Sequence, residues 1–175
     1  METVSYTITL ARAGDVPLLP AIELAAARLF EGYAPESLLT QTTSEQTLRL
    51  GQRRGLLWVA LADDKPVGFA LVDQIEPQSA HLEELDVHTD HMRRGLGSRL
   101  VTTVCDWAAE KGFDAVTLNT ARDVWWNMPF YERLGFKEVP RDEWTPALRR
   151  VFATETNRGL DPTRRLVMRR RTASR

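Results

Sequence analysis

The chain lacks the features that would place it in several broad classes of protein. It has one cysteine, Cys105, in 175 residues, which excludes an internal disulfide framework. Its 23 basic and 24 acidic residues leave a formal net charge of −1, so nothing global indicates binding to nucleic acid or to a membrane. The start, METVSYTITLARAGD, lacks the basic segment and apolar run of a secretory signal, and no apolar run is long enough to cross a bilayer. We therefore expect a soluble, cytoplasmic protein.

What is present is an ordinary globular composition, with 43% hydrophobic and 27% charged residues. A chain of this length is expected to form one domain over residues 1–175, with its core at about 5–170. Cys105 lies within a helical pattern of apolar residues, so we expect it to be a small buried side chain and not a nucleophile.

The apolar periodicity predicts a mixed α/β domain without an internal linker. Strands are expected at 5–13, 56–63, 65–76, 79–88, 113–120 and 164–169. Helices are expected at 14–33, 45–53, 95–111, 127–135 and 144–157. Asp63, Asp64 and Lys65 join two apolar runs as a hairpin would, and 81–119 forms a strand–loop–helix–strand unit whose strands should be parallel. In the first helix, the candidate buried residues are Ile22, Leu24, Leu29 and Phe30.

The loop RRGLGS, residues 93–98, has the parts of an anion cradle. Gly95 and Gly97 allow a sharp turn and a close approach of the backbone to a ligand. The helix that follows offers unpaired N–H groups and the positive end of its dipole, and Arg93 and Arg94 add positive charge. A tight turn whose arginines are simply solvated would have the same sequence pattern and is the alternative interpretation of this segment. No G-x-G-x-x-G occurs, because Leu100 stands where the third glycine is needed, and no Walker motif occurs either.

The segment WWNMPFYERLGF places Asn127 and Tyr131 four residues apart, on one face of a short helix. A phenol with a pKa near 10 is able to protonate a departing thiolate at neutral pH. Without further context, a tyrosine packed in the core is the alternative interpretation.

Together, LEELDVHTDHMRRGLGSRL and, some 30 residues later, NMPFYERLGF closely resemble the GNAT superfamily of acetyl-CoA-dependent N-acetyltransferases. In that family, a strand ending in L-x-V is followed by [QR]-x-x-G-x-[GA] at the start of a helix, and then by N-x-x-x-[FY]-Y-x-x-x-G-F. The resemblance implies a central mixed, mostly antiparallel sheet flanked by helices. It also implies acetyl transfer from acetyl-CoA to a small-molecule or peptide amine in a ternary complex. Dimers are common in the family, so a homodimer is compatible with it.

The resemblance also implies roles for particular residues. The backbone of Leu85, Asp86 and Val87 would pair with the pantetheine arm of the cofactor. Its pyrophosphate would be held, largely through backbone N–H groups, by Arg93, Arg94, Gly95, Leu96, Gly97 and Ser98. Asn127 would contact the cofactor, and Tyr131 would protonate the CoA thiolate. The chain departs from the family pattern at Met92, where Gln or Arg is usual, and this removes one side-chain donor to the phosphates.

The general base is expected on the strand before this loop. In a regular strand one face carries His81, Glu83, Leu85 and Val87, and the other carries Leu82, Glu84, Asp86 and His88. Glu83 shares the face of the L-x-V signature and is the expected base, directly or through water. His81 is an alternative, and so is Glu84, because the bulge that is usual in this strand in the family would change the facing.

No metal is expected, because His88 and His91 lie three apart without a third ligand at a matching spacing. Two rival functions stay open. One is an acyl-CoA-binding sensor of the same fold without turnover, and the other is an unrelated α/β protein that binds a nucleotide at 93–98. The amine acceptor cannot be named from the sequence, although the acids and aromatics near 28–39 and 125–126 suit a cationic amine with an apolar part.

Overall fold

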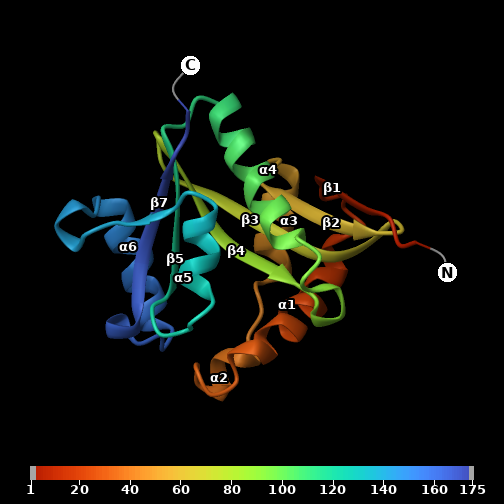
Figure 1. The fold of residues 1–175 in the computed structure, drawn as a ribbon, viewed down its shortest axis with the longest axis horizontal. Helices are drawn as coiled ribbons and strands as arrows, with labels where there is room; N and C mark the ends of the chain where they lie inside the picture. The colour runs from red at the N-terminus through yellow and green to blue at the C-terminus, as the bar shows by residue number, and fades with distance from the viewer. Residues whose placement is uncertain (1–2, 174–175) are drawn as a thin grey trace.

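A computed structural model describes residues 3–173 of the chain. Within this range seven strands form one sheet in the order β1-β2-β3-β4-β5-β7-β6. The strands are β1 (Tyr6–Leu10), β2 (Leu57–Ala62), β3 (Lys65–Glu76), β4 (Ser79–Val87), β5 (Ala115–Ala121), β6 (Lys137–Glu138) and β7 (Arg165–Arg171). All neighbouring strands are antiparallel except β4 and β5, which are parallel and are joined through a helix. The predicted mixed, mostly antiparallel sheet flanked by helices is confirmed (Figure 1).

The helices are α1 (Leu19–Ala27), α2 (Glu36–Leu39), α3 (Glu45–Arg53), α4 (Leu96–Glu110), α5 (Asn127–Arg133) and α6 (Pro146–Asn157), with short 3-10 turns between them. Ser44 caps α3 as expected, because its hydroxyl accepts a hydrogen bond from the N–H of Thr47 at 3.1 Å. The predicted hairpin is also present, and Asp63 and Asp64 both take positive φ between β2 and β3.

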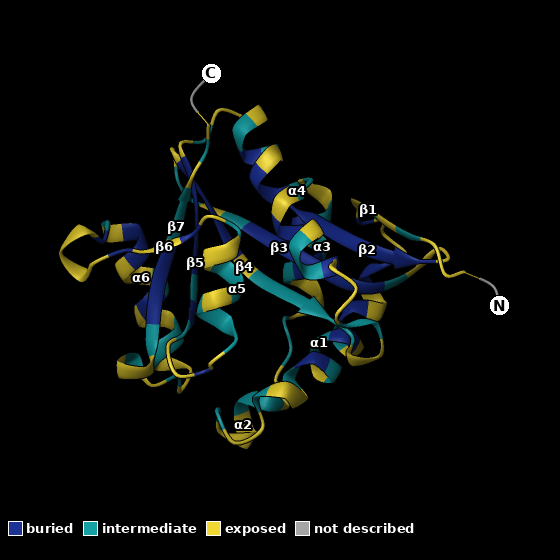
Figure 2. Cartoon of the chain, in the orientation of Figure 1, coloured by how far each residue is buried: buried dark blue, intermediate teal, exposed yellow. Residues whose placement is uncertain are grey.

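The core lies on both faces of the sheet (Figure 2). On one face, α4 buries the apolar stripe that was predicted from the sequence, including Leu100, Val104 and Cys105. On the other face, α1 and α3 cover β2 and β3, and α6 covers the region of β7. The two faces of the sheet are therefore covered by different helices, and β4 lies near the centre of the sheet between them.

The first helix differs from its prediction. The expected helix at 14–33 is divided into a 3-10 turn (Val16–Leu18), α1 and a second 3-10 turn (Arg28–Phe30). Ile22 is buried as expected, but Leu24 and Leu29 are 42% and 40% exposed. The buried stripe runs instead through Val16, Leu19, Ile22 and Ala26, at steps of three and four, and only this side of the helix meets the sheet.

None of the helices between residues 3 and 173 is both long and apolar enough to cross a membrane.

Candidate active site

The central feature of the site is the divergence of β4 from β5. The two strands pair from Ser79 with Ala115 to Leu82 with Leu118, and their pairing ends there. Past this point β4 continues to Val87 and β5 continues to Ala121, where β5 pairs with β7 on its other side (Figure 1). The edge of β4 at 83–87 therefore has no ladder to β5, and its backbone groups are available to an extended ligand.

A β-bulge at Glu83 sets the direction of the acidic side chains. On β3, which runs antiparallel to β4, Val72 pairs with Leu82 and the preceding residue, Leu71, pairs with Glu84. Glu83 therefore lies between two paired residues as the additional residue of the bulge. Leu82 is part of the core under α4, and so are Leu85 and Val87. The prediction that Glu83 shares a face with Leu85 and Val87 is thus wrong.

The bulge instead leaves Glu84 and Asp86 on the opposite face, because they pair with Leu71 and Phe69 in the core under α1 and α3. His81 pairs with Asp73 on this same face. The alternative interpretation, in which a bulge changes the facing of this strand, is the one that the structure supports.

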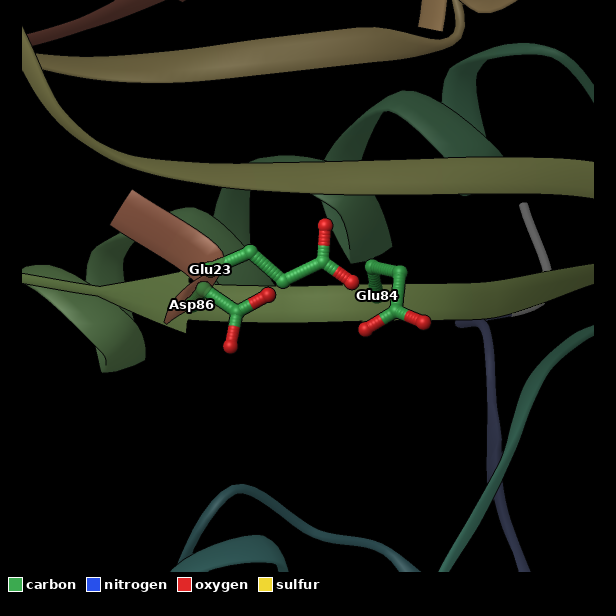
Figure 3. A group of neighbouring side chains, drawn as sticks. All are labelled: Glu23, Glu84 and Asp86. Carbon is green, nitrogen blue, oxygen red and sulfur yellow. The ribbon is translucent and has the colours of Figure 1, made fainter. Parts of the chain in front are cut away.

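Glu23 of α1 joins Glu84 and Asp86 in a cluster that we call the acidic triad (Figure 3). Oxygen atoms of the three carboxylates lie within 4.8 Å of one another. Loss of solvent raises the pKa of Glu84 well above its usual value, and the charges of Asp86 and Glu23 raise it further. Loss of solvent also raises the pKa of Asp86 well above its usual value, with Glu23 as the second cause. Because three neighbouring carboxylates repel one another, a cation placed among them would be stabilised.

Glu23 is held in place by Thr43. Its two carboxylate oxygens accept hydrogen bonds from the Thr43 N–H at 3.0 and 2.9 Å. Burial nevertheless raises the pKa of Glu23, because the loss of solvent outweighs these bonds. Glu23 was not predicted from the sequence as a site residue. The signal for it was a single acid within the otherwise apolar helix LPAIELAAA.

The other two candidate bases differ from Glu84 in their surroundings. Glu83 is an exposed residue, although partial loss of solvent and the nearby charge of Asp73 raise its pKa. His81 is buried, and its Nδ1 lies 2.9 Å from the Thr117 hydroxyl. Burial lowers the pKa of His81 to about 4, so its ring is neutral at physiological pH.

The loop at 93–98 leads into α4 on the side of the sheet opposite the acidic triad. Gly95 takes the left-handed conformation at the start of α4, with φ of 75°, and Arg93 has φ of 57°. Arg93, Arg94 and Gly95 are exposed, and Leu96 is buried as the first apolar contact of the helix. A Cβ added to Gly97 would lie 3.4 Å from the ring of Phe130, so the first turn of α4 sits closely against α5.

The N-terminal strand holds this loop in position. The Tyr6 hydroxyl lies 3.0 Å from Nδ1 of His91, and the guanidinium of Arg94 lies 5.8 Å from the centre of the Tyr6 ring. Arg99 donates a hydrogen bond to the Tyr6 carbonyl at 3.2 Å. The contact with Tyr6 keeps Arg94 at the start of α4, where it adds positive charge to the N-terminus of the helix. Arg94 is two residues after Met92, the position at which the chain departs from the family pattern.

Asn127 and Tyr131 lie on α5 as predicted. The Asn127 amide donates to the Thr120 hydroxyl at 3.1 Å, which ties α5 to the end of β5. The Tyr131 ring packs edge-on against Phe130 and Phe136, with centroids 4.9 and 5.8 Å away. Burial raises the pKa of Tyr131, and the nearby charges of Asp86 and Glu84 raise it further. A phenol with such a pKa keeps its proton at neutral pH and is able to donate a hydrogen bond.

An aromatic bridge, made of Phe30, Tyr33 and Trp126, connects the segment after α1 with the loop after β5. The Trp126 ring centre lies 6.0 Å from that of Phe30 and 5.4 Å from that of Tyr33. Since α1 packs on β4 and Trp126 follows β5, the bridge links the β4 side of the sheet to the β5 side. All three rings are half-buried, whereas the neighbouring Trp125 is 75% exposed.

The acidic triad has the oxygen spacing that a bound cation requires, and it was not among the metal ligands considered from the sequence. His88 and His91 are also close, with ring centres 6.2 Å apart. His88 and His91 instead bond within their own loop and to β1, through Asp90 and Tyr6. Both oxygens of Glu23 accept a hydrogen bond from Thr43, and each keeps a further acceptor site.

Comparison with known proteins assigns the family. The model of the acetyltransferase (GNAT) family matches residues 23–136. Human N-acetyltransferase 8 is 31% identical over 135 residues, which are 74% of this chain and 60% of that protein. The probable N-acetyltransferase camello of Xenopus tropicalis is 30% identical over 158 residues, covering 89% of this chain and 71% of the relative. This chain therefore spans about three fifths of the length of the human relative.

Solved structures agree on the fold. PaiA N-acetyltransferase from Thermoplasma acidophilum, solved in complex with coenzyme A, has a TM-score of 0.74 at 18% identity and covers 95% of this chain and 99% of its own. The ribosomal-protein-S18-alanine N-acetyltransferase of Escherichia coli has a TM-score of 0.69 at 22% identity, covering 98% of this chain and 96% of its own. With a family model that matches most of its length and relatives of about 30% identity, this chain belongs to the GNAT acetyltransferase family.

Proposed function

We propose that the protein is an acetyl-CoA-dependent N-acetyltransferase that acts on a primary amine by direct attack in a ternary complex. The observation that carries this proposal is the gap past Leu82 and Leu118, which has acids on one face and the glycine–arginine loop with Tyr131 on the other. Such a gap allows two ligands to meet from opposite faces of the sheet. The amine is a small molecule or a peptide amine.

The cofactor side is formed by residues that fit a long anionic thioester. The unpaired edge at Leu85, Asp86 and Val87 accommodates the amide groups of pantetheine as a further strand would. The N–H groups at the start of α4, from Gly95 to Ser98, suit the pyrophosphate, and Arg93 and Arg94 add charge there. Asn127, at the start of α5, is fixed to Thr120 near the end of β5.

The amine side is formed by the acidic triad, where the positive charge of an ammonium group would offset the repulsion between the three carboxylates. We assign the general base to Glu84 in preference to Glu83. Glu84 is the less exposed of the two, and it is close enough to Tyr131 for its charge to raise the pKa of that phenol. A carboxylate with a raised pKa is also the stronger base.

The chemical step then balances as follows. Glu84 removes a proton from the ammonium, directly or through water, and the neutral nitrogen attacks the carbonyl carbon of the thioester. A C–N bond forms and the C–S bond breaks. As the C–S bond breaks, Tyr131 donates its proton to the sulfur and takes up the second proton of the positively charged nitrogen. The products are the N-acetylated amine and free CoA, and Glu84 carries the first proton. The attack on the thioester is direct, without an acyl-enzyme. The thiol of Cys105 is not suited to carry an acyl group, because it lies on the buried face of α4 and burial raises its pKa to about 11.

Two measurements in one preparation test the proposal. Calorimetric titration with acetyl-CoA, repeated in the presence of ATP, measures binding and its selectivity. Release of free thiol in the presence of a panel of primary amines then measures turnover. Binding of acetyl-CoA with thiol release on at least one amine is the expected result. Binding without release on any amine would indicate a sensor of the same fold, and tighter binding of ATP would indicate a nucleotide site.

A further inference from the structure

Asn119 is a polar side chain for which the fold supplies no partner. Its Nδ2 and Oδ1 atoms are both out of contact with solvent and unbonded, and Oδ2 of Asp86 is in the same state. Over residues 3–173 these are the three side-chain atoms of this kind. A buried polar group without a partner loses its hydrogen bonds to water and gains none in return, so native proteins rarely keep one without a reason.

The place of Asn119 in the sheet indicates what that reason is. Thr117, two residues earlier, faces the same side of β5 and bonds to His81 across the last part of the sheet where β4 and β5 still pair. Asn119 is the first residue on β5 past Leu118, where the pairing ends. Its backbone pairs with Val167, which belongs to the core under α6, and its side chain therefore faces the same side of the sheet as Glu84 and Asp86.

The neighbouring polar residues of β5 make the contrast clear. Thr117 is bonded to His81, and Thr120 is bonded to Asn127. Asn119 lies between them with an unbonded donor and an unbonded acceptor. The three unbonded atoms thus belong to two residues, Asn119 on β5 and Asp86 on β4. Both residues face the gap between these strands from the side of the acidic triad.

These atoms describe the chemistry of a ligand. An ionised Asp86 accepts hydrogen bonds, whereas the amide of Asn119 requires one acceptor and one donor. We propose that Asn119 binds the acceptor substrate, and that this substrate carries a hydroxyl or amide group next to its primary amine. This inference rests on the proposed function. An amine with only a hydrocarbon next to its nitrogen would leave both atoms of Asn119 unbonded.

The test compares two acceptors that differ by one group. Ethanolamine and propylamine have the same number of heavy atoms, and the hydroxyl of the first stands where the second has a methyl. The measured quantity is the ratio of their kcat/KM values, which is compared between the wild type and Asn119→Leu so that differences in amine reactivity cancel. Glycinamide serves as the amide counterpart. Asn157→Leu, on the exposed end of α6, is the matched control.

The ratio should fall about tenfold or more in Asn119→Leu, through loss of ethanolamine turnover, and stay unchanged in Asn157→Leu. The melting temperature of ligand-free Asn119→Leu should rise by about 3 °C, because an orphaned amide is replaced by an apolar group of similar size. Asn119→Ala, which adds no volume, should show the same change in ratio.

Equal turnover losses for both amines, or a lower melting temperature, would show that Asn119 has a structural role and would overturn the inference. Acetyl-CoA binding with turnover of propylamine as efficient as that of ethanolamine and glycinamide would overturn it too, while leaving the proposed function intact. Absence of turnover on every amine would instead refute the proposed function, and the inference with it.

Discussion

Replacement of Gly68 by alanine tests whether the end of β4 has to lie where the structure places it. Gly68 is on β3 and pairs with Val87, the last residue of β4. A Cβ at this position would lie 2.9 Å from the carbonyl oxygen of Asp86 and 3.2 Å from a methyl group of Val87. The carbonyl belongs to the backbone, so no change of rotamer relieves the first contact, and β4 has to move.

The size of the effect follows from two opposing terms. Overpacking against backbone costs about 2–3 kcal/mol, and the smaller conformational freedom of alanine in the unfolded chain returns about 0.4–1 kcal/mol. The free energy of unfolding should therefore fall by about 1–2.6 kcal/mol, which for a domain of this size lowers the melting temperature by about 2–10 °C. Movement of Asp86 and Val87 should also weaken one backbone hydrogen bond to the cofactor, so that acetyl-CoA binds about three- to tenfold more weakly.

Urea unfolding and calorimetric titration with acetyl-CoA measure the two effects of Gly68→Ala separately. Gly14→Ala is the matched control, because a Cβ at Gly14 meets no atom within 4 Å. Its stability should be equal to that of the wild type or slightly higher. If Gly68→Ala is as stable as Gly14→Ala, the contact with the Asp86 carbonyl does not constrain β4. If it is less stable but binds acetyl-CoA normally, the end of β4 is not part of the cofactor site.

Further predictions concern the acid, the base and the thiol. Tyr131→Phe should lower kcat about a hundredfold and change the affinity for acetyl-CoA little, and an unchanged kcat would remove Tyr131 from the acid role. Glu84→Gln should lower kcat about 10²- to 10⁴-fold, whereas Glu83→Gln should lower it about tenfold or less, and the reverse order would assign the base to Glu83. The folded state raises the pKa of Glu84 and so binds its proton more tightly than the unfolded state does. This proton stabilises the folded state fully below the unfolded pKa of Glu84, and the stabilisation is lost as pH rises through the folded pKa. The melting temperature of Glu84→Gln should therefore exceed that of the wild type at pH 8 and approach it at pH 4.5. An equal difference in melting temperature at both pH values would contradict this. Cys105, whose pKa burial raises to about 11, should react with iodoacetamide at pH 8 much more slowly in the folded than in the urea-unfolded protein, and similar rates would show that the thiol is accessible.

Local patterns predicted most of the secondary structure. The apolar spacing of α4, the cap at Ser44 and the aspartates between β2 and β3 each depend on residues that are near in sequence, and each is confirmed. The first helix was predicted less well. Leu24 and Leu29 are apolar but exposed, because the surface against which α1 packs is formed by β3 and β4 and is set by the tertiary structure.

The candidate site divides in the same way. The glycine–arginine loop and the pair Asn127 and Tyr131 could be found from the sequence, because each is a short motif whose geometry a helix determines. The facing of Glu83 could not. A bulge depends on how β4 pairs with β3. The additional residue separates Glu83 from the face of Leu85 and Val87, whereas Glu84 and Asp86 lie opposite these two residues, as expected.

By itself, the sequence determined the order of the elements, the parallel unit of β4, α4 and β5, and the resemblance that led to the family, since these depend on the period and spacing of neighbouring residues. Only the tertiary structure decided which side chains meet. Glu23 and Glu84 are far apart in the chain, and Asn119 acquires its meaning from the point where β5 leaves β4. Burial raises the pKa values of Glu23 and Glu84 and leaves the Asn119 amide without hydrogen bonds. This burial is a property of the assembled fold, because elements that are far apart in the chain together exclude solvent from these groups.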